Sequence, residues 1–322
     1  MDRLLQILSD GEYHSGEELG KSLGISRTAI WKQMQKIEAL GLLVESQKGC
    51  GYRILGGLDL LVEELICNEL SITAQALLAK LELQSSVSST NELARQQAEK
   101  GDASGSVIIA EQQVSGRGRR GRQWVSPYGC NLYLSLVWGF EGGVQAIEGL
   151  SLAVGVAVLR GLKRCGAEGI ELKWPNDLLW QQKKAGGILL EVIGDPSGFC
   201  QVVVGVGLNV GMRNHNSSAI DQDWTNIDEL LSADVGRSEL AGVIVDELLL
   251  LLGKYHLEGF AGCRDEWLQH DAYADRPIKL LMINKSVEGI ARGVDDSGAL
   301  KFEVNGQVQI ISGGEISLRA AE

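Results

Sequence analysis

The chain lacks the sequence features of a secreted or membrane-spanning protein. Its six cysteines are scattered and no two stand at C-x-x-C spacing, which argues against a metal centre or a disulfide framework and suits a reducing cytoplasm. No signal peptide is evident, and the apolar run Leu248–Leu252 is five residues long, far too short to cross a bilayer. We therefore predict a soluble, cytoplasmic protein with no membrane partner.

Several catalytic and nucleotide-binding motifs are also absent. The sequence contains no Walker motif, no G-x-G-x-x-G opening a helix and no H-E-x-x-H pair. None of the four histidines adjoins the unusual stretches described below, so histidine chemistry is not expected. The net charge of −12 argues against a general polyanion binder, and any contact with nucleic acid must therefore be local.

Residues 1–60 are predicted to form a winged helix-turn-helix domain. The first 55 residues carry seven basic and seven acidic side chains, so this is the least acidic part of the chain. Hydrophobic spacing and capping signals at Ser15 and Ser26 predict three helices and a hairpin. The expected elements are helices over Arg3–Leu8, Glu17–Leu23 and residues 27–40, and a hairpin over Leu42–Leu55.

The third helix of this domain has a polar, basic face that suits the major groove of DNA. A protein-interaction domain of the same shape is the alternative, in which these side chains are simply solvated. A lone module of this size binds weakly, so specific binding implies a dimer on a two-part operator. The candidate DNA-binding residues are Ser26, Arg27, Thr28, Trp31, Lys32, Gln35 and, in the hairpin, Lys48.

Residues 61–272 are predicted to form an α/β domain with a mixed or antiparallel sheet and helices on one side of it. Short apolar runs joined by hairpin-length links indicate the strands, and two long apolar-periodic segments indicate the helices. The strand candidates are Val107–Ala110, Leu132–Val137, Ile170–Trp174, Ile188–Ile193 and Val202–Val206. The helix candidates are Gln145–Arg164 and Ser238–Tyr255.

The segment Ser115–Trp124 stands out within this domain, because four arginines alternate there with three glycines. Glycine lets the backbone approach a ligand closely, and arginine offers a forked donor for carboxylate and phosphate oxygens. A flexible basic loop that touches nucleic acid or only solvent is the alternative. Further polar or glycine-rich stretches occur at predicted strand ends. They are residues 88–91, Gln113, Lys173–Asp177, Lys184–Ile188 and Gly205–Asn209.

Together these stretches predict a cationic, glycine-lined pocket. Bringing a carboxylate against a phosphate costs roughly 4 kcal/mol per charge pair at 4 Å and an effective dielectric near 20. Arginine and lysine remove that repulsion and stabilise charge as it spreads over phosphoryl oxygens. The pocket therefore suits activation of a carboxylate by adenylylation.

With these stretches and the C-terminal segment Gly313–Arg319, the chain closely resembles the bifunctional biotin protein ligases that are also biotin operon repressors, over nearly its whole length. The resemblance implies that biotin and Mg-ATP give biotinyl-5′-adenylate. The biotinyl group then passes to a lysine of the biotin carboxyl carrier protein of acetyl-CoA carboxylase. It also implies that the adenylate-bound protein forms a homodimer, through loops near Gly139–Gly143 and Ile193–Gly198, and binds the biotin operator. The central domain would be class II synthetase-like.

The resemblance also assigns roles to matching positions. Lys184 and Arg119 would be catalytic, with Lys184 holding the biotin carboxylate and the α-phosphate together. Asp177 is a candidate metal ligand. The expected biotin contacts are Ser89, Thr90, Asn91, Gln113, Arg117, Gly118, Arg119 and Lys184. The expected ATP and adenylate contacts are Arg119, Arg122, Trp124, Asn176, Asn209 and Arg319.

Residues 273–322 are predicted to form a small SH3-like β-barrel, from short strands over Pro277–Ile283, Val287–Val294, Leu300–Val304 and Val308–Ile311. Three other functions remain open from the residues alone. They are a ligase for another carboxylate such as lipoate, a biotin-responsive repressor without ligase activity, and a ligase whose N-terminal domain no longer binds DNA.

Overall fold

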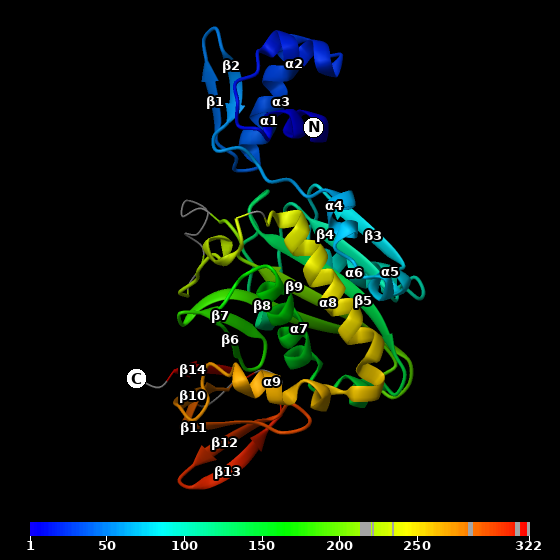
Figure 1. Cartoon of the computed structure of the whole chain (residues 1–322), viewed down its shortest axis with the longest axis vertical. Helices are drawn as coiled ribbons and strands as arrows, with labels where there is room; N and C mark the ends of the chain where they lie inside the picture. The colour runs from blue at the N-terminus through cyan, green and yellow to red at the C-terminus, as the bar shows by residue number, and fades with distance from the viewer. Residues whose placement is uncertain (213–219, 221, 234, 283–285, 313–315, 321–322) are drawn as a thin grey trace.

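The computed structural model of the protein describes residues 1–212, 220, 222–233, 235–282, 286–312 and 316–320. Along its longest axis lie a helical N-terminal module, a large central sheet covered by helices, and a smaller C-terminal sheet (Figure 1). The six cysteines are all free, as the sequence predicted.

The N-terminal module follows the predicted pattern closely. Its elements are α1 (Asp2–Leu8), α2 (Gly16–Leu23), α3 (Arg27–Ala39) and the antiparallel pair β1 (Val44–Gln47) and β2 (Gly51–Ile54). The capping box is present: the Ser15 hydroxyl accepts the Glu18 N–H, and the Glu18 carboxylate accepts the Ser15 N–H. Ile30, Met34 and Ile37 of α3 are buried in the core of this module. All seven candidate DNA-binding residues are exposed.

The central sheet has seven strands and is mixed. They are β3 (Lys80–Gln84), β4 (Ser106–Ala110), β5 (Leu132–Phe140), β6 (Ile170–Lys173), β7 (Asp177–Trp180), β8 (Lys183–Gly194) and β9 (Cys200–Leu208). Their order is β3-β4-β5-β9-β8-β7-β6; β3 and β4 run parallel and every other neighbouring pair is antiparallel. The sequence did not predict β3, because Lys-Leu-Glu-Leu-Gln alternates polar and apolar residues over only five positions.

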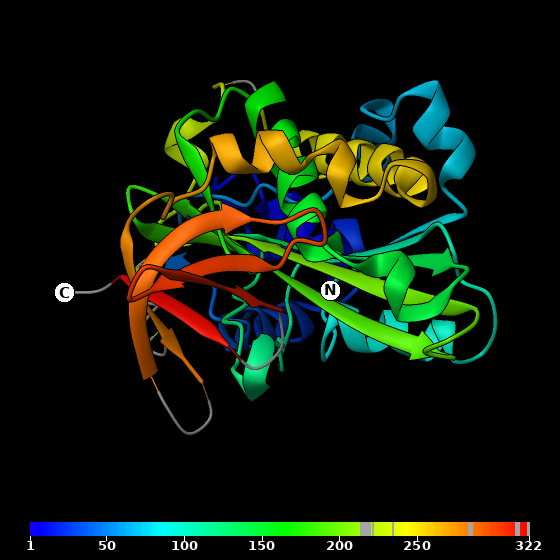
Figure 2. The same ribbon diagram turned by 90° about the horizontal axis from the view of Figure 1, so that it is seen from below.

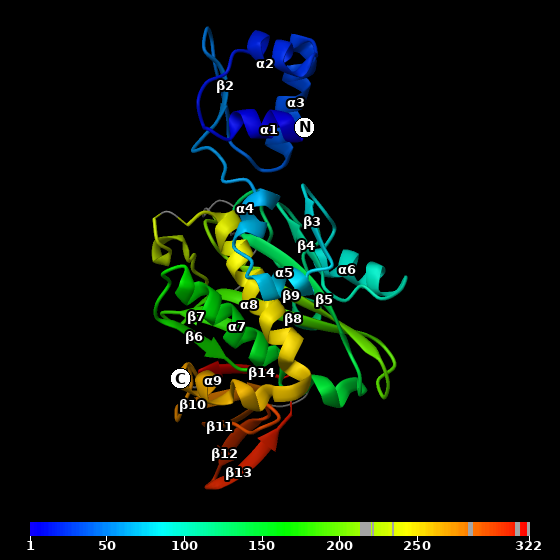
Figure 3. The same cartoon turned by 45° about the vertical axis from the view of Figure 1, so that its right-hand side comes forward.

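Helices cover both faces of this sheet, so the expectation of helices on one side was wrong. On one face lie the long α7 (Leu150–Arg164) and α8 (Arg237–Glu258), with the short α4 (Glu63–Asn68), α5 (Ile72–Leu77) and α9 (Arg264–Gln269) packed around them. On the other face α6 (Thr90–Ala98) stands apart (Figure 3). Ile108, Val137 and Val203 pack against α6, whereas their strand neighbours belong to the larger core under α7 and α8, because side chains alternate along a strand.

One segment, Gly143–Arg164, is long and apolar enough to cross a membrane by length and composition. It consists of the short 3-10 helix η2 (Gly143–Ile147) and of α7, and the predicted single helix Gln145–Arg164 is therefore interrupted at Gly149. Eleven of the fifteen residues of α7 are buried, and its apolar side chains belong to the core shared with α8. Burial inside the protein accounts for the composition of this segment.

The C-terminal module is a five-stranded antiparallel sheet, seen at one end of the molecule beside α9 (Figure 2). Its strands are β10 (Pro277–Leu281), β11 (Ser286–Val294), β12 (Leu300–Val304), β13 (Gln307–Ile311) and β14 (Ser317–Ala320), in the order β13-β12-β11-β10-β14. The sequence did not predict β14. Ile283, the expected end of the first strand, lies outside the described residues. The Trp174 indole N–H donates to the Gly298 carbonyl at 3.1 Å and ties this sheet to the central domain.

A buried ion pair fixes the segment between the N-terminal module and the central sheet. The Arg237 guanidinium lies 2.8 Å from the Glu111 carboxylate, and both side chains are less than one-tenth exposed. The second Glu111 oxygen accepts the Leu61 N–H at 2.6 Å. The Arg237 N–H donates to the Asp59 carboxylate at 2.7 Å. The chain leaving the N-terminal module is thus held from both sides by charged groups.

We predict that Arg237→Met lowers the free energy of unfolding by about 3–5 kcal/mol, because it leaves the Glu111 charge buried without its partner. The double variant Arg237→Met/Glu111→Gln should recover part of that loss, since the buried charge is gone and an acceptor for Leu61 remains. Urea titration of the full chain measures both. Lys254→Met, which removes an exposed ion pair with Glu258, is the control and should cost less than about 1 kcal/mol. Equal losses for Arg237→Met and Lys254→Met would contradict the prediction.

Candidate active site

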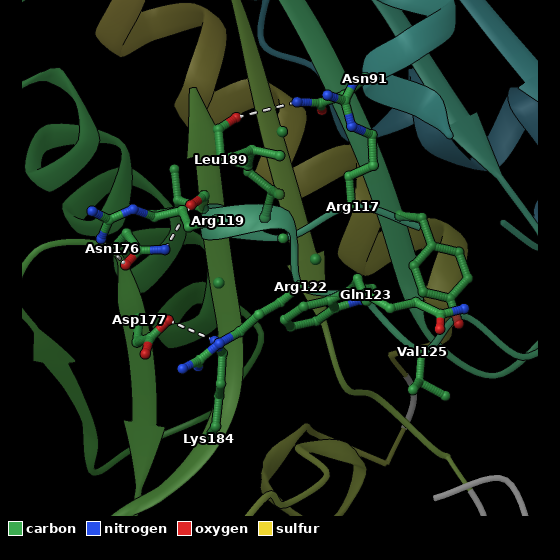
Figure 4. A pocket seen from close by; sticks show the side chains of 18 of the residues that line it. Asn91, Arg117, Arg119, Arg122, Gln123, Val125, Asn176, Asp177, Lys184 and Leu189 are labelled. Atoms are coloured by element: carbon green, nitrogen blue, oxygen red, sulfur yellow. Dashed lines mark hydrogen bonds and ion pairs between the residues drawn. The ribbon is translucent and has the colours of Figure 1, made fainter. Parts of the chain in front are cut away.

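A cavity of about 300 Å³ lies between the start of α6, the arginine-glycine loop and strands β8 and β9. Its walls come from segments that are far apart in the chain (Figure 4). The structure brings together here nearly all of the predicted site residues. They are Ser89, Thr90, Asn91, Gln113, Arg117, Gly118, Arg119, Arg122, Trp124, Asn176, Asp177, Lys184 and Asn209.

One end of the cavity is a buried network of hydroxyl and amide groups around the start of α6. The Gln113 carbonyl oxygen accepts both the Thr90 N–H at 2.9 Å and the Thr90 hydroxyl at 3.1 Å. The Gln113 amide donates to the Ser126 hydroxyl at 3.0 Å. The Ser135 hydroxyl donates to the Asn91 carbonyl oxygen at 2.6 Å and lies 2.8 Å from the Thr90 hydroxyl. This end is neutral and offers fixed hydrogen-bonding groups.

Asn91 is held on its other side by strand β8. Its amide donates to the Glu191 carboxylate at 2.8 Å and to the Leu189 carbonyl at 3.4 Å. Both partners can only accept, so the orientation of the Asn91 amide is fixed. Asn91 lies directly on β9, where an added Cβ at Gly205 would stand 2.1 Å from the Asn91 carbonyl oxygen. Glycine at position 205 therefore makes room for Asn91.

The opposite end of the cavity is cationic, and Figure 4 shows Asp177 and Lys184 there, away from Asn91. The Lys184 ammonium lies 2.7 Å from the Asp177 carboxylate, and the Lys173 ammonium lies 3.8 Å from the same group. Burial, together with positive charges nearby, lowers the pKa of Lys173 to about 8, although Asp177 opposes the shift. Two lysines thus share one carboxylate, and the cluster keeps a surplus of positive charge.

The arginine-glycine loop forms a lid across the middle of the cavity. Arg119, in the 3-10 helix η1 (Arg119–Gly121), donates to the Asn176 carbonyl oxygen at 2.9 Å, and Asn176 in turn donates to the Ile188 carbonyl at 2.8 Å. Burial lowers the pKa of Arg119. Arg120 adopts a positive φ of 59°, which is uncommon for a residue with a side chain. The loop is thereby tied to the turn between β6 and β7.

Trp124 closes the loop and lies against the two glycine-rich strands. An added Cβ at Gly207 would stand 2.7 Å from the Trp124 ring, and the Lys184 ammonium lies 5.3 Å from a ring centroid. This distance suits a cation–π contact. The Trp124 indole N–H is buried and has no hydrogen-bond partner among the described residues.

Among the described residues, one predicted contact, Arg319, is not in the cavity wall. Arg319 lies on β14 beside Lys279; it contributes to the lowered pKa of Lys173 but does not line the cavity. Gly313, Gly314 and Glu315 lie outside the described residues. Asn209 lines the cavity, but its amide donates to the Lys184 carbonyl at 3.1 Å, so it supports the strand that carries Lys184.

The sequence also missed residues that the fold brings to the site. Ser135 and Glu191 belong to the Asn91 network, and Trp224 lines the cavity and forms a bridge with Lys184. Ser135 lies in an otherwise apolar strand, where a lone hydroxyl is a weak signal. Glu191 is one of several acidic residues outside any glycine or arginine pattern.

Family models match three parts of the chain. Residues 83–209 match the Biotin/lipoate A/B protein ligase family, residues 1–53 an HTH domain, and residues 274–319 the Biotin protein ligase C terminal domain. A curated relative, the Bifunctional ligase/repressor BirA of Escherichia coli, is 39% identical over 99% of this chain and 97% of its own length. The chain belongs to this family of bifunctional biotin ligases and repressors.

Other relatives of the family agree with this assignment. A Biotin--[acetyl-CoA-carboxylase] ligase of Paracoccus denitrificans is 33% identical over 65% of this chain and 88% of its own length. Among solved structures, a biotin protein ligase from Aquifex aeolicus in complex with biotin and ATP aligns with a TM-score of 0.64 at 26% identity, covering 76% of this chain and all of that one. The central ligase fold and the N-terminal helix-turn-helix character are thus confirmed.

We predict that Gly205→Ala destabilises the protein by about 1–3 kcal/mol, because its methyl group forces Asn91 out of the network. Gly155→Ala in α7 is the control: there an added Cβ meets its nearest side chain at 3.5 Å. Alanine in a helix interior should be neutral or stabilise by about 0.5–1 kcal/mol. Thermal unfolding of both variants tests whether Gly205→Ala lowers the stability while Gly155→Ala leaves it unchanged or raises it. Similar shifts for the two would show that Asn91 yields without cost.

Proposed function

We propose that the protein joins biotin to a carrier protein in two steps and also represses transcription when it holds the intermediate. In the first step a biotin carboxylate oxygen attacks the α-phosphorus of ATP, and pyrophosphate leaves. In the second step the amine of a carrier lysine attacks the acyl carbon, and AMP leaves. We propose that the carrier is the biotin carboxyl carrier protein of acetyl-CoA carboxylase; the Paracoccus relative's name gives acetyl-CoA-carboxylase as its substrate.

The polarity of the cavity is the observation that carries this proposal. Biotin has a neutral, hydrogen-bonding ring at one end and a carboxylate at the other. The cavity has the Thr90–Gln113 network at one end and Lys184 with Asp177 at the other, and the Lys173 ammonium lies 3.8 Å from Asp177 without lining the cavity. We infer that the ring lies beside Ser89, Thr90, Asn91 and Gln113, and that the carboxylate points toward Lys184. Because Asn91 is saturated by protein partners, it positions the network more than it contacts biotin.

Lys184 is the residue we assign to the reacting groups. It projects from β8 beside Trp124 and is less than one-fifth exposed. An ammonium in a partly dry site offsets the repulsion between a carboxylate and a phosphate far better than one in water. Arg119 and Arg122, from the lid, approach the same end and would hold the phosphate oxygens and the adenylate, with Trp124 packed on the adenine. Arg319 does not line the cavity, and its positive charge would act on the site by lowering the pKa of Lys173.

The site suits magnesium that arrives with ATP. Mg²⁺ is commonly bound by one or two carboxylates together with substrate phosphates, and not by a protein-built cage. The described residues hold no group of three His, Cys, Asp or Glu side chains that would form such a cage. Asp177 is the one carboxylate among the described residues that line the cavity. We propose it as the protein ligand, where the ion would neutralise phosphate charge.

The enzymatic proposal is tested by biotin-dependent exchange of pyrophosphate into ATP. Lys184→Ala should lower the exchange rate by about 100-fold or more, because a charge that stabilises the transition state is lost. Its neighbour Lys183 is exposed and lies outside the cavity wall, so Lys183→Ala is the matched control and should exchange normally. Full exchange by Lys184→Ala would remove Lys184 from the mechanism. No exchange by the unmodified protein would favour a repressor without ligase activity, and exchange with lipoate would favour that substrate.

The N-terminal module supports the repressor role. We propose that residues 1–60 form a winged helix-turn-helix domain in which α3 enters the major groove and the β1–β2 hairpin is the wing. Ser26, Arg27, Thr28, Trp31, Lys32 and Gln35 share the exposed face of α3, and Lys48 lies at the exposed tip of the hairpin. Trp31 is half-exposed, which is unusual for so large an apolar side chain.

An open strand edge supports a homodimer of the loaded protein. β7 pairs with β8 only as far as Gly187, and Leu189–Ile193 have no strand neighbour on that side within the described chain. The two predicted interface loops lie side by side, since the Gly143 N–H donates to the Gly198 carbonyl at 2.7 Å. We propose that two copies pair along this edge. We further propose residues 61–272 as the class II synthetase-like ligase domain and 273–322 as an SH3-like barrel, in a cytoplasmic protein.

Operator binding is tested by gel shift with the biotin-operon promoter of the same organism, with and without adenylate. Lys32→Ala should weaken the shift by about tenfold and lower the slope of log K against log salt by about one, because one phosphate contact is lost. Lys21→Ala, an exposed lysine on α2, should bind as the unmodified protein does. Equal binding by all three would contradict the placement of α3. No shift even with adenylate would mean a ligase without DNA binding.

A further inference from the structure

Glu191 is the point where the buried polar network meets the arginine-glycine lid. One of its carboxylate oxygens accepts the Asn91 amide at 2.8 Å. The other lies 3.2 Å from the Arg117 guanidinium. The same guanidinium nitrogen lies 3.3 Å from the Glu92 carboxylate, on the first turn of α6. A single side chain on β8 therefore contacts both the floor of the cavity and its lid.

We propose that Glu191 is a positioning residue of the ligase reaction, whose two carboxylate oxygens separately orient the Asn91 amide and hold the lid through Arg117. This inference rests on the proposed function of the cavity. The contact with Asn91 affects binding of the biotin ring, because Asn91 and Ser135 fix the Thr90–Gln113 network at that end of the cavity. The second acts on retention of the adenylate, because Arg117 is the first arginine of the lid.

The two contacts differ in strength, and the difference makes them separable. The Asn91 amide is buried, and without Glu191 its remaining acceptor is the Leu189 carbonyl at the weaker distance of 3.4 Å. A buried donor left with a poor partner is costly. Arg117, in contrast, is half-exposed, whereas Glu191 is about one-fifth exposed. Its ion pairs are screened by solvent, so lid retention should change only modestly when one carboxylate is lost.

Two substitutions at position 191 separate the roles. Glu191→Gln keeps an oxygen that accepts the Asn91 amide but removes the charge facing Arg117. We expect biotin KM to stay within about twofold, and adenylate to be released about two- to fivefold faster. Glu191→Ala removes both contacts, and we expect a biotin KM about tenfold higher in addition to the faster release. Glutamine at position 191 should therefore restore the biotin KM that alanine raises, but should not restore slow release of the adenylate. A residue with only a structural role would not separate the two effects.

Two further variants control for charge and for the second carboxylate. Glu92→Gln should speed release as Glu191→Gln does, since it removes the other partner of Arg117. Glu99→Gln neutralises a carboxylate at the C-cap of α6 that pairs with Arg95 and lies outside the cavity wall. It should change neither KM nor release, and faster release by Glu99→Gln would show a bulk charge effect and overturn the proposal.

A readout independent of activity comes from the lid itself, because Arg117, Arg119, Arg120 and Arg122 are trypsin sites. Glu191→Gln without ligand should be cut within the lid faster than the unmodified protein, and bound adenylate should slow cutting in both. Unchanged cutting together with unchanged release in Glu191→Gln overturns the lid contact, even if Glu191→Ala does not fold. Absence of biotin-dependent exchange in the unmodified protein would instead sink the proposed function, which distinguishes the two failures.

Discussion

The repulsion between a carboxylate and a phosphate is the constraint on which the site depends. Lys184, on β8, lines the cavity together with Arg119 and Arg122 of the arginine-glycine loop, and Lys173 lies 3.8 Å from Asp177 without lining the cavity. Burial lowers the pKa of Lys173, and the positive charges of Arg319, Lys184 and Arg122 lower it further. The charge of Asp177 opposes this lowering, and its carboxylate accepts the Lys184 ammonium at 2.7 Å. The Asp177 carboxylate thus holds the Lys184 ammonium in place and lies 3.8 Å from that of Lys173.

The segment that follows the arginine-glycine loop also contacts the N-terminal module. Trp124 ends the lid beside Gly207, and four residues later the buried side chain of Tyr128 belongs to the core of the N-terminal module, against Leu58. Glu111, which holds the linker through Leu61 and Arg237, accepts the Gly129 N–H through its carbonyl at 3.0 Å. The lid and the contacts with the N-terminal module therefore belong to one continuous stretch of chain, which gives a physical basis for combining the two activities in one protein.

Local signals predicted most of the elements and most of the cavity wall. Capping at Ser15, helical spacing in α3 and glycines beside arginines each report a local physical requirement, and a recognisable family pattern joined them into one site. The residues that were missed act only through tertiary contacts. Glu191 reaches Asn91 from a position 100 residues away, and nothing near it in the sequence marks that contact. The second face of the sheet was missed for a related reason. That α6 lies on the opposite face from α7 and α8 depends on the packing of Ile108, Val137 and Val203 against it, which no local pattern reports.

The position of Glu191 also bears on how an anionic product can be retained by a lid that must open. If every lid arginine bound only the phosphate end, release of pyrophosphate would leave the lid with fewer partners. Arg117 instead pairs with Glu92 and Glu191, at the neutral end of the cavity, where charge does not change during the reaction. Because those pairs are half-exposed, they stabilise closure weakly. In the proposed reaction, a weak, constant contact at one end of the cavity and a strong, changing one at the other would let the loop stay closed over the adenylate and still open for the carrier lysine.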